Sequence, residues 1–257
     1  ASSGIGEAFA QVFSEQGFDL VLTARRQDRL ESIASKLKLI RPTNIHIIQA
    51  DLSDPMAPRN ILEFCTQNSI HVDCLVNNAG YGIADNVAEI SQEQIDYGLG
   101  LLSSVILGIK YAVEPMKAIG GGCIINNSSV AGHVYGQGSP LYSSLKSAVS
   151  HYSRMAGVSL GPFNIRVNAI SPGAIATPIF WGGSQRANTL SEKENERKME
   201  KLKVNLAKAV PLAKTGLAED ISEAALYLAS DAGRFVTCHD LVVDGGRSVA
   251  YNEPHQS

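Results

Sequence analysis

A tyrosine and a lysine stand four positions apart in the segment Tyr142-Ser143-Ser144-Leu145-Lys146. Residues at i and i+4 of a helix share one face, so this phenol and this ammonium can approach each other. A tyrosine with a pKa of about 10 is a poor base near neutrality, and half-ionisation there needs about 4 kcal/mol. One positive charge at roughly 4 Å, in an effective dielectric of about 20, supplies a similar energy. The pair can therefore exchange protons with a substrate, although the spacing alone is also typical of a solvated helix face.

Polar residues and glycines follow several short apolar runs that are typical of strands. Ser129 lies just beyond the run 123–126. The other such positions are Asp51, Asn77, Ala79, Gly80, Pro172 and Gly173. In an open parallel sheet, ligands bind beyond the carboxyl ends of the strands. The joint placement of these residues therefore favours one shared site over independent roles.

The first six residues, Ala1-Ser2-Ser3-Gly4-Ile5-Gly6, run directly into a helical pattern. Glycines in such a turn let backbone amides approach a pyrophosphate, and the helix N-terminus favours its negative charge. Taken alone the signal is weak, because glycine-rich turns are common. A dinucleotide-binding turn also needs a strand before it. We therefore expect roughly ten further residues upstream, forming a buried strand that ends in Thr-Gly.

These residues need a scaffold, and the chain alternates short apolar runs with longer helical patterns. The predicted strands are 18–23, 45–50, 74–77, 123–126, 165–170 and 241–244. The predicted helices are 6–15, 29–39, 57–68, 92–116, 142–160 and 220–229. Mostly apolar strands suit a parallel sheet that is buried on both faces. The pattern predicts an α/β fold, a single Rossmann-type domain over 1–257 with a doubly wound parallel sheet and helices on both faces.

The composition argues against several other classes of protein. The net charge of −3, without a lysine or arginine block, disfavours nucleic acid or an anionic membrane as a partner. The longest apolar stretch, 99–109, contains two serines and is too short for a bilayer span. The four cysteines form no CxxC pair, which is typical of reduced thiols in a cytoplasmic protein. The six histidines have no HxH or HExxH spacing, so no metal site is expected.

Together these motifs resemble the short-chain dehydrogenase/reductase family, from residue 1 to about 250. The resemblance gives Ser129, Tyr142 and Lys146 the places of the family's catalytic serine, tyrosine and lysine. Its cofactor-binding positions are matched by Ser3, Gly4, Ile5, Gly6, Asp51, Leu52, Asn77, Ala79, Gly80, Pro172, Gly173, Ile175 and Thr177, together with Tyr142 and Lys146.

The resemblance implies an oxidoreductase that moves a hydride between a nicotinamide cofactor and a carbonyl or secondary alcohol. In this reading Tyr142 exchanges a proton with the substrate oxygen and Ser129 holds that oxygen. Lys146 binds the nicotinamide ribose and lowers the pKa of the tyrosine. Two alternatives stay open: a lyase or epimerase of the same superfamily, and a non-catalytic cofactor-binding or regulatory protein. Lys146 counts against the related dehalogenating enzymes, in which an arginine replaces the lysine.

One position departs from the family pattern. The family carries a fourth catalytic residue, an asparagine in the long helix before the serine strand, and 88–124 contains no asparagine. Leu101 stands at the expected position, with Ser103 and Ser104 nearby. Either serine could help to order the water of the proton relay. Alternatively, both hydroxyls bond back to helix carbonyls.

The cofactor preference is predicted from the end of the second family strand, which here is followed by Arg25 and Arg26, with no acid before Asp28. An acidic residue there would bond the 2′-hydroxyl of NAD(H). A guanidinium instead binds the 2′-phosphate of NADP(H) with paired, charge-assisted bonds. NADP(H) is therefore favoured and NAD(H) is possible, since an arginine that only covers the adenine ring serves either cofactor.

Substrate specificity is expected in the segment 178–212, read as a lid. Phe180 and Trp181 could line an apolar substrate site or merely pack the lid onto the body. Ser191 and Glu194 have the spacing of a capping box at the start of a charged helix. The helices 92–116 and 142–160 are richly apolar for surface elements. Members of the resembled family commonly pair these helices between subunits, so the resemblance implies a homodimer or homotetramer. The other expected partner is a small alcohol or ketone substrate.

Overall fold

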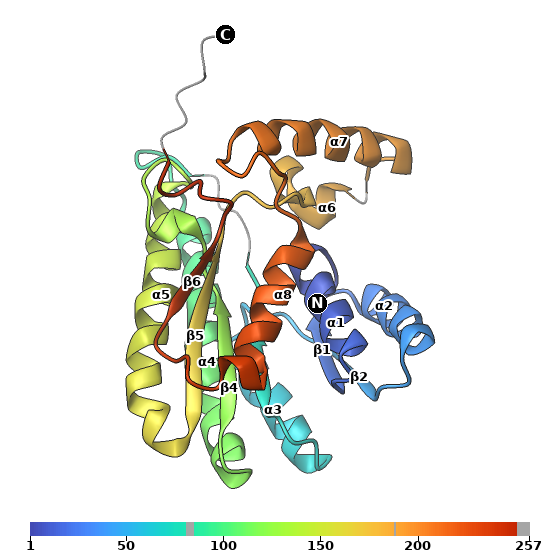
Figure 1. Cartoon of the computed structure of the whole chain (residues 1–257), viewed down its shortest axis with the longest axis vertical. Coiled ribbons are helices and arrows are strands. Elements are labelled where there is room, and N and C mark those ends of the chain that lie inside the picture. The colour runs from blue at the N-terminus through green and yellow to red at the C-terminus, as the bar shows by residue number, and fades with distance from the viewer. Residues whose placement is uncertain (81–84, 188, 251–257) are drawn as a thin grey trace.

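A computed structural model describes residues 1–80, 85–187 and 189–250, and its elements follow the predicted α/β alternation (Figure 1). The strands are β1 (Leu20–Ala24), β2 (Ile45–Gln49), β3 (Cys74–Asn77), β4 (Gly122–Asn127), β5 (Ile165–Pro172) and β6 (Asp240–Val243). The helices are α1 (Gly4–Glu15), α2 (Gln27–Ile40), α3 (Ala57–Gln67), α4 (Gln92–Ala118), α5 (Pro140–Leu160), α6 (Gly183–Ala187), α7 (Glu192–Lys208) and α8 (Ala218–Ala229). The predicted fold class is confirmed.

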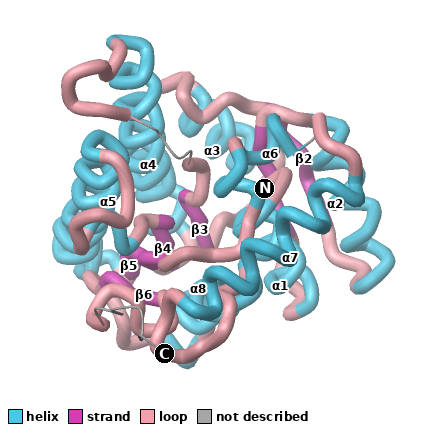
Figure 2. Tube along the Cα trace, turned by 90° about the horizontal axis from the view of Figure 1, so that it is seen from above, coloured by secondary structure: helices cyan, strands magenta, loops and turns pink. Residues whose placement is uncertain are grey.

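Helices cover both faces of the strands (Figure 2). Side chains of α3, α4 and α5 form one apolar core with β4 and β5, and side chains of α1 and α8 form a second core on the other face. In β4, Ile124 belongs to the first core, whereas Cys123 and Ile125 belong to the second. This alternation follows the two-residue period of a strand, and it explains why β4 is apolar at successive positions.

The hydrogen-bonded parallel strands form two groups among the described residues. Strands β3, β4, β5 and β6 pair in that order, whereas β1 and β2 pair only with each other among the described residues. A cavity of about 880 Å³ is lined by residues of both β1 and β3, and it separates the two groups of strands.

Helix α4 is the one described helix that is long and apolar enough to cross a membrane. Its apolar residues have another use, because Val105, Ile109, Ala112 and Met116 are buried in the core against the strands and α5. Packing within the domain therefore uses part of the apolar surface of α4, with 33% of its most apolar window buried. The predicted cytoplasmic location and the predicted pairing of subunits through α4 and α5 stay predictions.

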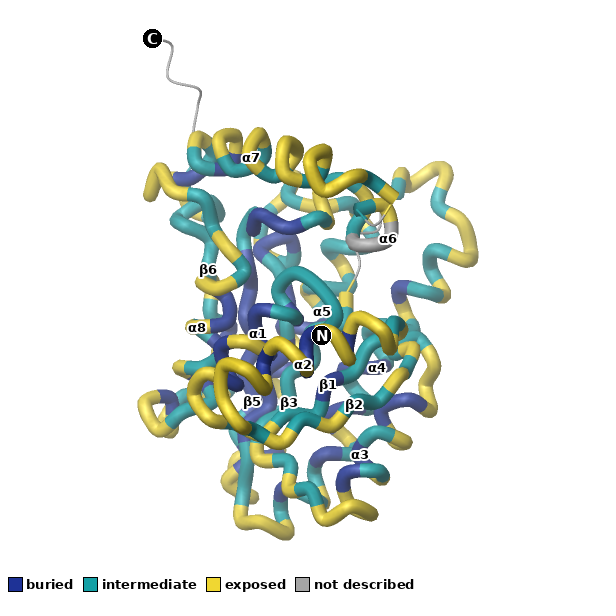
Figure 3. Tube along the Cα trace, turned by 90° about the vertical axis from the view of Figure 1, so that its right-hand side faces the viewer, coloured by how far each residue is buried: buried dark blue, intermediate teal, exposed yellow. Residues whose placement is uncertain are grey.

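The segment predicted as a lid forms a separate layer above the carboxyl ends of the strands (Figure 1). It contains a short 3-10 turn (Pro178–Trp181), α6 and α7, while its residue 188 lies outside the described residues. The capping box at the start of α7 is confirmed, since Ser191 and Glu194 exchange side-chain and backbone hydrogen bonds. Exposed residues dominate α7, whereas β5 consists mostly of buried residues (Figure 3).

Candidate active site

Two asparagine pairs join the carboxyl ends of β3 and β4. The Asn77 amide donates to Asn126 Oδ1 at 2.8 Å, and the Asn127 amide donates to Asn78 Oδ1 at 2.7 Å. Asn77 and Asn126 are partners in the strand register, so parallel pairing aligns both dipeptides. Gly108 of α4 makes room for this arrangement, because a Cβ there would lie 2.7 Å from Asn77 Oδ1. The two loops that follow these strands are thereby held together.

Tyr142 and Lys146 lie in the first turns of α5, on one face as their spacing predicted. The helix begins with Pro140 at its first position, and the N-cap residue makes no side-chain cap within the described structure. The Asp85 carboxylate supplies a cap from elsewhere, accepting a hydrogen bond from the Leu141 amide at 3.2 Å. A carboxylate at a helix N-terminus is stabilising because it satisfies a free amide and interacts favourably with the helix dipole. Asp85, which the sequence analysis missed, thus anchors the turn that carries Tyr142.

Lys146 is directed toward the ends of β3 and β4. Its ammonium donates to the Asn127 carbonyl oxygen at 2.7 Å and lies 5.7 Å from the centre of the Tyr142 ring. A Cβ on Gly80 would lie 3.5 Å from Lys146 Nζ, so the loop after β3 passes directly beside the ammonium. Burial lowers the pKa of Lys146 to about 8. The ammonium is therefore poised to lose its proton within a physiologically relevant pH range.

Ser129 contacts the Tyr142 phenol by a side-chain hydrogen bond, which lowers the tyrosine pKa, but burial has the larger effect and leaves that pKa raised. The predicted depression of the tyrosine pKa by Lys146 is therefore not seen in the protein alone. The ammonium lies too far from the ring for its charge to outweigh the desolvation of a phenolate. In this state Tyr142 is a protonated phenol.

The cavity between β1 and β3 is lined by many of the residues that were predicted to bind the cofactor. Its lining includes Ser3, Gly6, Arg25, Arg26, Asp51, Leu52, Asn77, Ala79 and Gly80. Gly4, at φ +57°, opens α1, and Ile5 follows it in the first turn. Ser3 makes no side-chain cap among the described residues, so the first amides of α1 are free to bind an anion.

The two arginines after β1 have different surroundings. Arg26 donates from Nη2 to the carbonyl and hydroxyl oxygens of Ser2, both at 3.1 Å, and so lies against the glycine turn. Its Nη1 is buried without a hydrogen-bond partner in the described structure, and burial lowers the Arg26 pKa. Arg25 is exposed. The pKa of Asp51 is lowered mainly by a hydrogen bond from the Ser53 amide, and the positive charge of Arg25 lowers it further.

The segment after β5 lies between the glycine turn and the end of β6. A Cβ on Gly4 would lie 3.6 Å from Thr177, and a Cβ on Gly173 would lie 2.6 Å from that of Asp244. Ile175 forms an isolated parallel bridge with Gly216. The backbone from Pro172 to Thr177 thus approaches Asp244 closely and lies next to the glycine turn, outside the lining of the large cavity.

The residues around the missing asparagine lie on α4. Leu101 and Ser104 line the large cavity, as Tyr97 does. The Ser104 hydroxyl is buried and donates to the Leu101 carbonyl oxygen at 2.8 Å. The hydroxyl hydrogen of Ser104 therefore bonds back to a helix carbonyl, as the second of the two predictions for this residue expected.

Ser104→Ala is expected to leave the pH–rate profile of the enzyme unchanged, because the hydroxyl hydrogen is already committed to the Leu101 carbonyl. The measurement is kcat and kcat/KM across the pH range, with Ser103→Ala as the matched variant on the same helix. A displaced profile for Ser104→Ala would instead assign this hydroxyl to the proton relay.

The two aromatic residues predicted at the lid differ in their contacts. Trp181 donates from its indole nitrogen to Asn195 Oδ1 of α7 at 3.3 Å, so it joins the 3-10 turn to the lid helix. Phe180 is about half exposed, at 49%. The packing role is therefore evident for Trp181, while a substrate-lining role stays a prediction for both residues.

Known proteins are similar to this chain over nearly its whole length. A family model described as Enoyl-(Acyl carrier protein) reductase matches residues 1–248. The trans-4-hydroxycyclohexanecarboxylate dehydrogenase of Sinomonas cyclohexanicum is 30% identical, over 98% of this chain and 92% of its own length. The L-sorbose reductase of Gluconobacter frateurii, solved with NADPH and L-sorbose, is 29% identical with a TM-score of 0.85, covering 97% of this chain and 94% of that one. A short-chain type dehydrogenase/reductase from Mycobacterium marinum is 28% identical with a TM-score of 0.82, covering 97% and 93%.

The doubly wound fold and a family model that spans nearly the whole chain together define the class of protein. The chain belongs to the short-chain dehydrogenase/reductase family. It is an NAD(P)-dependent oxidoreductase that acts on alcohol or carbonyl groups. The first reading of the motifs is thereby confirmed at the level of family and reaction class.

Proposed function

We propose that the protein interconverts a secondary alcohol and a ketone with NADP(H) as the preferred cofactor, using Ser129, Tyr142 and Lys146. The observation that carries the proposal is the convergence of these three side chains at the ends of β3 and β4. Ser129 bonds to the Tyr142 phenol, and the Lys146 ammonium lies 5.7 Å from the ring of that tyrosine. A hydroxyl, a phenol and an ammonium in this arrangement can hold a substrate oxygen and deliver a proton to it.

The glycine turn, the arginines after β1 and Lys146 would hold NADPH, which would supply the hydride to the carbonyl carbon in the direction of reduction. The Ser129 hydroxyl and the Tyr142 phenol hold the carbonyl oxygen, and the phenol proton passes to that oxygen as its negative charge develops. The raised pKa of Tyr142 in the protein alone keeps this proton in place before the reaction. The Lys146 ammonium stabilises the resulting phenolate until a proton returns from solvent.

The groups around the glycine turn fit the cofactor. The free first amides of α1 suit a pyrophosphate, and the buried Arg26 Nη1 needs an acceptor that the described residues do not provide. A 2′-phosphate on the adenosine ribose is such an acceptor. The exposed Arg25, which precedes Arg26 in the sequence, can bind the same phosphate. No acidic residue occupies the position directly after β1, where NAD(H) would be favoured.

Arg25→Asp is expected to weaken NADP(H) binding far more than NAD(H) binding, since the substitution replaces a cation beside the 2′-phosphate with an anion. The measurement is the dissociation constant of each cofactor by direct titration. Lys36→Asp, an equal charge change at an exposed position of α2, controls for net charge. Equal affinities of the unmodified protein for NAD(H) and NADP(H) would overturn the preference.

The substrate class is tested by following nicotinamide absorbance with panels of cyclic secondary alcohols, sugars and their ketones, using both cofactors. The relatives named as a hydroxycyclohexanecarboxylate dehydrogenase and a sorbose reductase direct the choice of these panels. Turnover that Ser129→Ala suppresses is the expected result. Tight cofactor binding without any turnover would instead support a non-catalytic protein, and release of a product without net hydride transfer would support a lyase or epimerase.

A further inference from the structure

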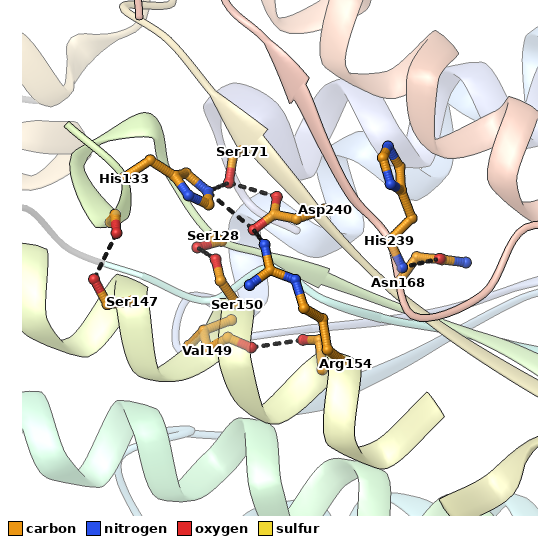
Figure 4. A network of polar contacts seen from close by, with 12 residues as sticks. Ser128, His133, Ser147, Val149, Ser150, Arg154, Asn168, Ser171, His239 and Asp240 are labelled. Carbon is orange, nitrogen blue, oxygen red and sulfur yellow. Dashed lines mark hydrogen bonds and ion pairs between the residues drawn. The ribbon is translucent and has the colours of Figure 1, made fainter. Parts of the chain in front are cut away.

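A second polar cluster lies beside the candidate site, between α5, β5 and β6 (Figure 4). Its centre is the Asp240 carboxylate, whose side chain is only 2% exposed. The Ser171 hydroxyl donates to Asp240 Oδ1 at 2.7 Å. His133 Nε2 lies 3.0 Å from Asp240 Oδ2 and 3.0 Å from Ser171 Oγ, and Arg154 Nη2 lies 3.9 Å from Asp240 Oδ2. Burial of a carboxylate costs free energy unless the carboxylate is paired, so we asked what the groups around Asp240 hold in place.

His133 connects the cluster to the candidate active site, because it ends the short turn that begins at Ser129. Ser129 caps this 3-10 turn through the Ala131 amide, and the His133 amide closes it on the Val130 carbonyl at 2.9 Å. The turn has one further anchor, the Ser147 hydroxyl of α5, which donates to the Gly132 carbonyl at 2.6 Å. The position of Ser129 is therefore fixed by α5 on one side and by His133 on the other.

We propose that His133 and Asp240 are positioning residues, which hold the Ser129 turn against β5 and β6 and so set the distance between Ser129 and Tyr142. The proposal rests on the function proposed above. Ser171 hydrogen-bonds to both of them and directly precedes Pro172, which begins a segment predicted to bind the cofactor. The same link thus ties the substrate-oxygen side of the site to the cofactor side.

The geometry argues against a hydrolytic serine–histidine–aspartate triad in this cluster. In such a triad the histidine lies between the other two groups and uses a different ring nitrogen for each. Here the single atom Nε2 faces both Ser171 and Asp240, and the Ser171 hydrogen already points to the carboxylate. Ser171 is also fully buried, at 0% exposure, so no substrate carbonyl can reach it. A holding role fits these contacts, whereas nucleophilic chemistry does not.

The test is a double-mutant cycle on the full-length enzyme, with turnover measured at saturating cofactor. His133→Ala is expected to lower kcat roughly tenfold or more, since misplacement of a reacting group by about 1 Å costs up to about 10²-fold. The cofactor dissociation constant should stay within about twofold. In a Ser129→Ala background the same substitution should have no further effect on kcat, because His133 acts through Ser129. His133→Gln, which keeps a side-chain donor, should recover part of the lost activity, and Asp240→Asn should resemble His133→Ala.

His151→Ala, which removes an exposed histidine from α5, is the matched control and should leave kcat unchanged. Equal losses from His133→Ala with and without Ser129 would overturn the positioning role while leaving the proposed function intact. If Ser129→Ala itself left kcat unchanged, the proposed function would fail instead. If His133→Ala does not fold, His133→Gln replaces it in the double-mutant cycle. A loss of kcat from His133→Gln that is additive with the loss from Ser129→Ala would again exclude the proposal.

Discussion

Tyr142→Phe is expected to lower kcat by about 10²–10⁴-fold, the usual contribution of a general acid or base. The substitution deletes one hydroxyl and leaves the aromatic ring. The ring therefore keeps its close packing against Gly138, where an added Cβ would lie 2.8 Å from a ring carbon. The dissociation constants of NADPH and NADP⁺ should change by no more than about twofold, because the Lys146 ammonium and the glycine turn are untouched. Initial rates and direct cofactor titration measure the two effects separately.

Tyr152→Phe provides the matched control, since it removes the same hydroxyl from a tyrosine further along α5 that packs on the apolar core. It should retain nearly full activity. If Tyr142→Phe kept more than about a hundredth of the wild-type kcat, Tyr142 would not be the proton donor. The alternative assignment would then be a donor supplied by solvent through the α4 side of the cavity.

The parts of the fold that sequence patterns predict well are those whose burial is uniform. Strand β4 is apolar on both faces because α5 and α8 cover opposite sides, and that pattern identifies a central parallel strand without further information. Tyr142 and Lys146 were equally predictable, since the helix period alone puts positions i and i+4 on one face. The capping box of Ser191 and Glu194 is likewise a local property of the sequence.

Other features depend on contacts that no local pattern contains. Asp240 precedes a short apolar run and reads as a turn residue, because aspartate is depleted in strands. Its partners come from the Ser129 turn, from α5 and from β5, and the register of β5 and β6 is what brings Ser171 close to it. Asp85 is similar, since it caps a helix from a distant part of the chain.

Tyr142 and Lys146 are shifted in opposite directions in the protein alone. Burial raises the pKa of the phenol and lowers the pKa of the ammonium, so both groups are moved toward their neutral forms. An oxidised nicotinamide carries a positive charge and favours the phenolate when it binds nearby. The expected hydrogen bond from Lys146 to a ribose hydroxyl of the cofactor favours the ammonium form of the lysine. In the proposed mechanism, cofactor binding therefore favours the phenolate form of Tyr142 and the ammonium form of Lys146, and cofactor affinity depends on the charge of Lys146.

Lys146→Ala is expected to reduce both turnover and cofactor affinity. Loss of one charged hydrogen bond costs about 1.5–3 kcal/mol, which corresponds to roughly 10- to 150-fold weaker cofactor binding. Turnover should fall by a further 10²-fold or so, because the phenolate of Tyr142 loses its stabilising charge. Direct titration gives the first quantity, and kcat at saturating cofactor gives the second. A loss of affinity without a loss of kcat would limit the role of Lys146 to holding the cofactor.

The pH dependence of cofactor binding gives a second test of Lys146. Its pKa is lowered from 10.5 to about 8, so the side chain is charged below pH 8 and loses its proton as the pH rises through that value. Cofactor affinity should accordingly be constant from about pH 6 to 7.5 and fall above pH 8, by up to about tenfold per pH unit. Lys146→Arg keeps its charge over the whole range, and its dissociation constant should stay flat. An unmodified enzyme whose affinity is equally flat up to pH 9.5 would show that the Lys146 charge does not contact the cofactor, and the assignment of this residue would have to be withdrawn.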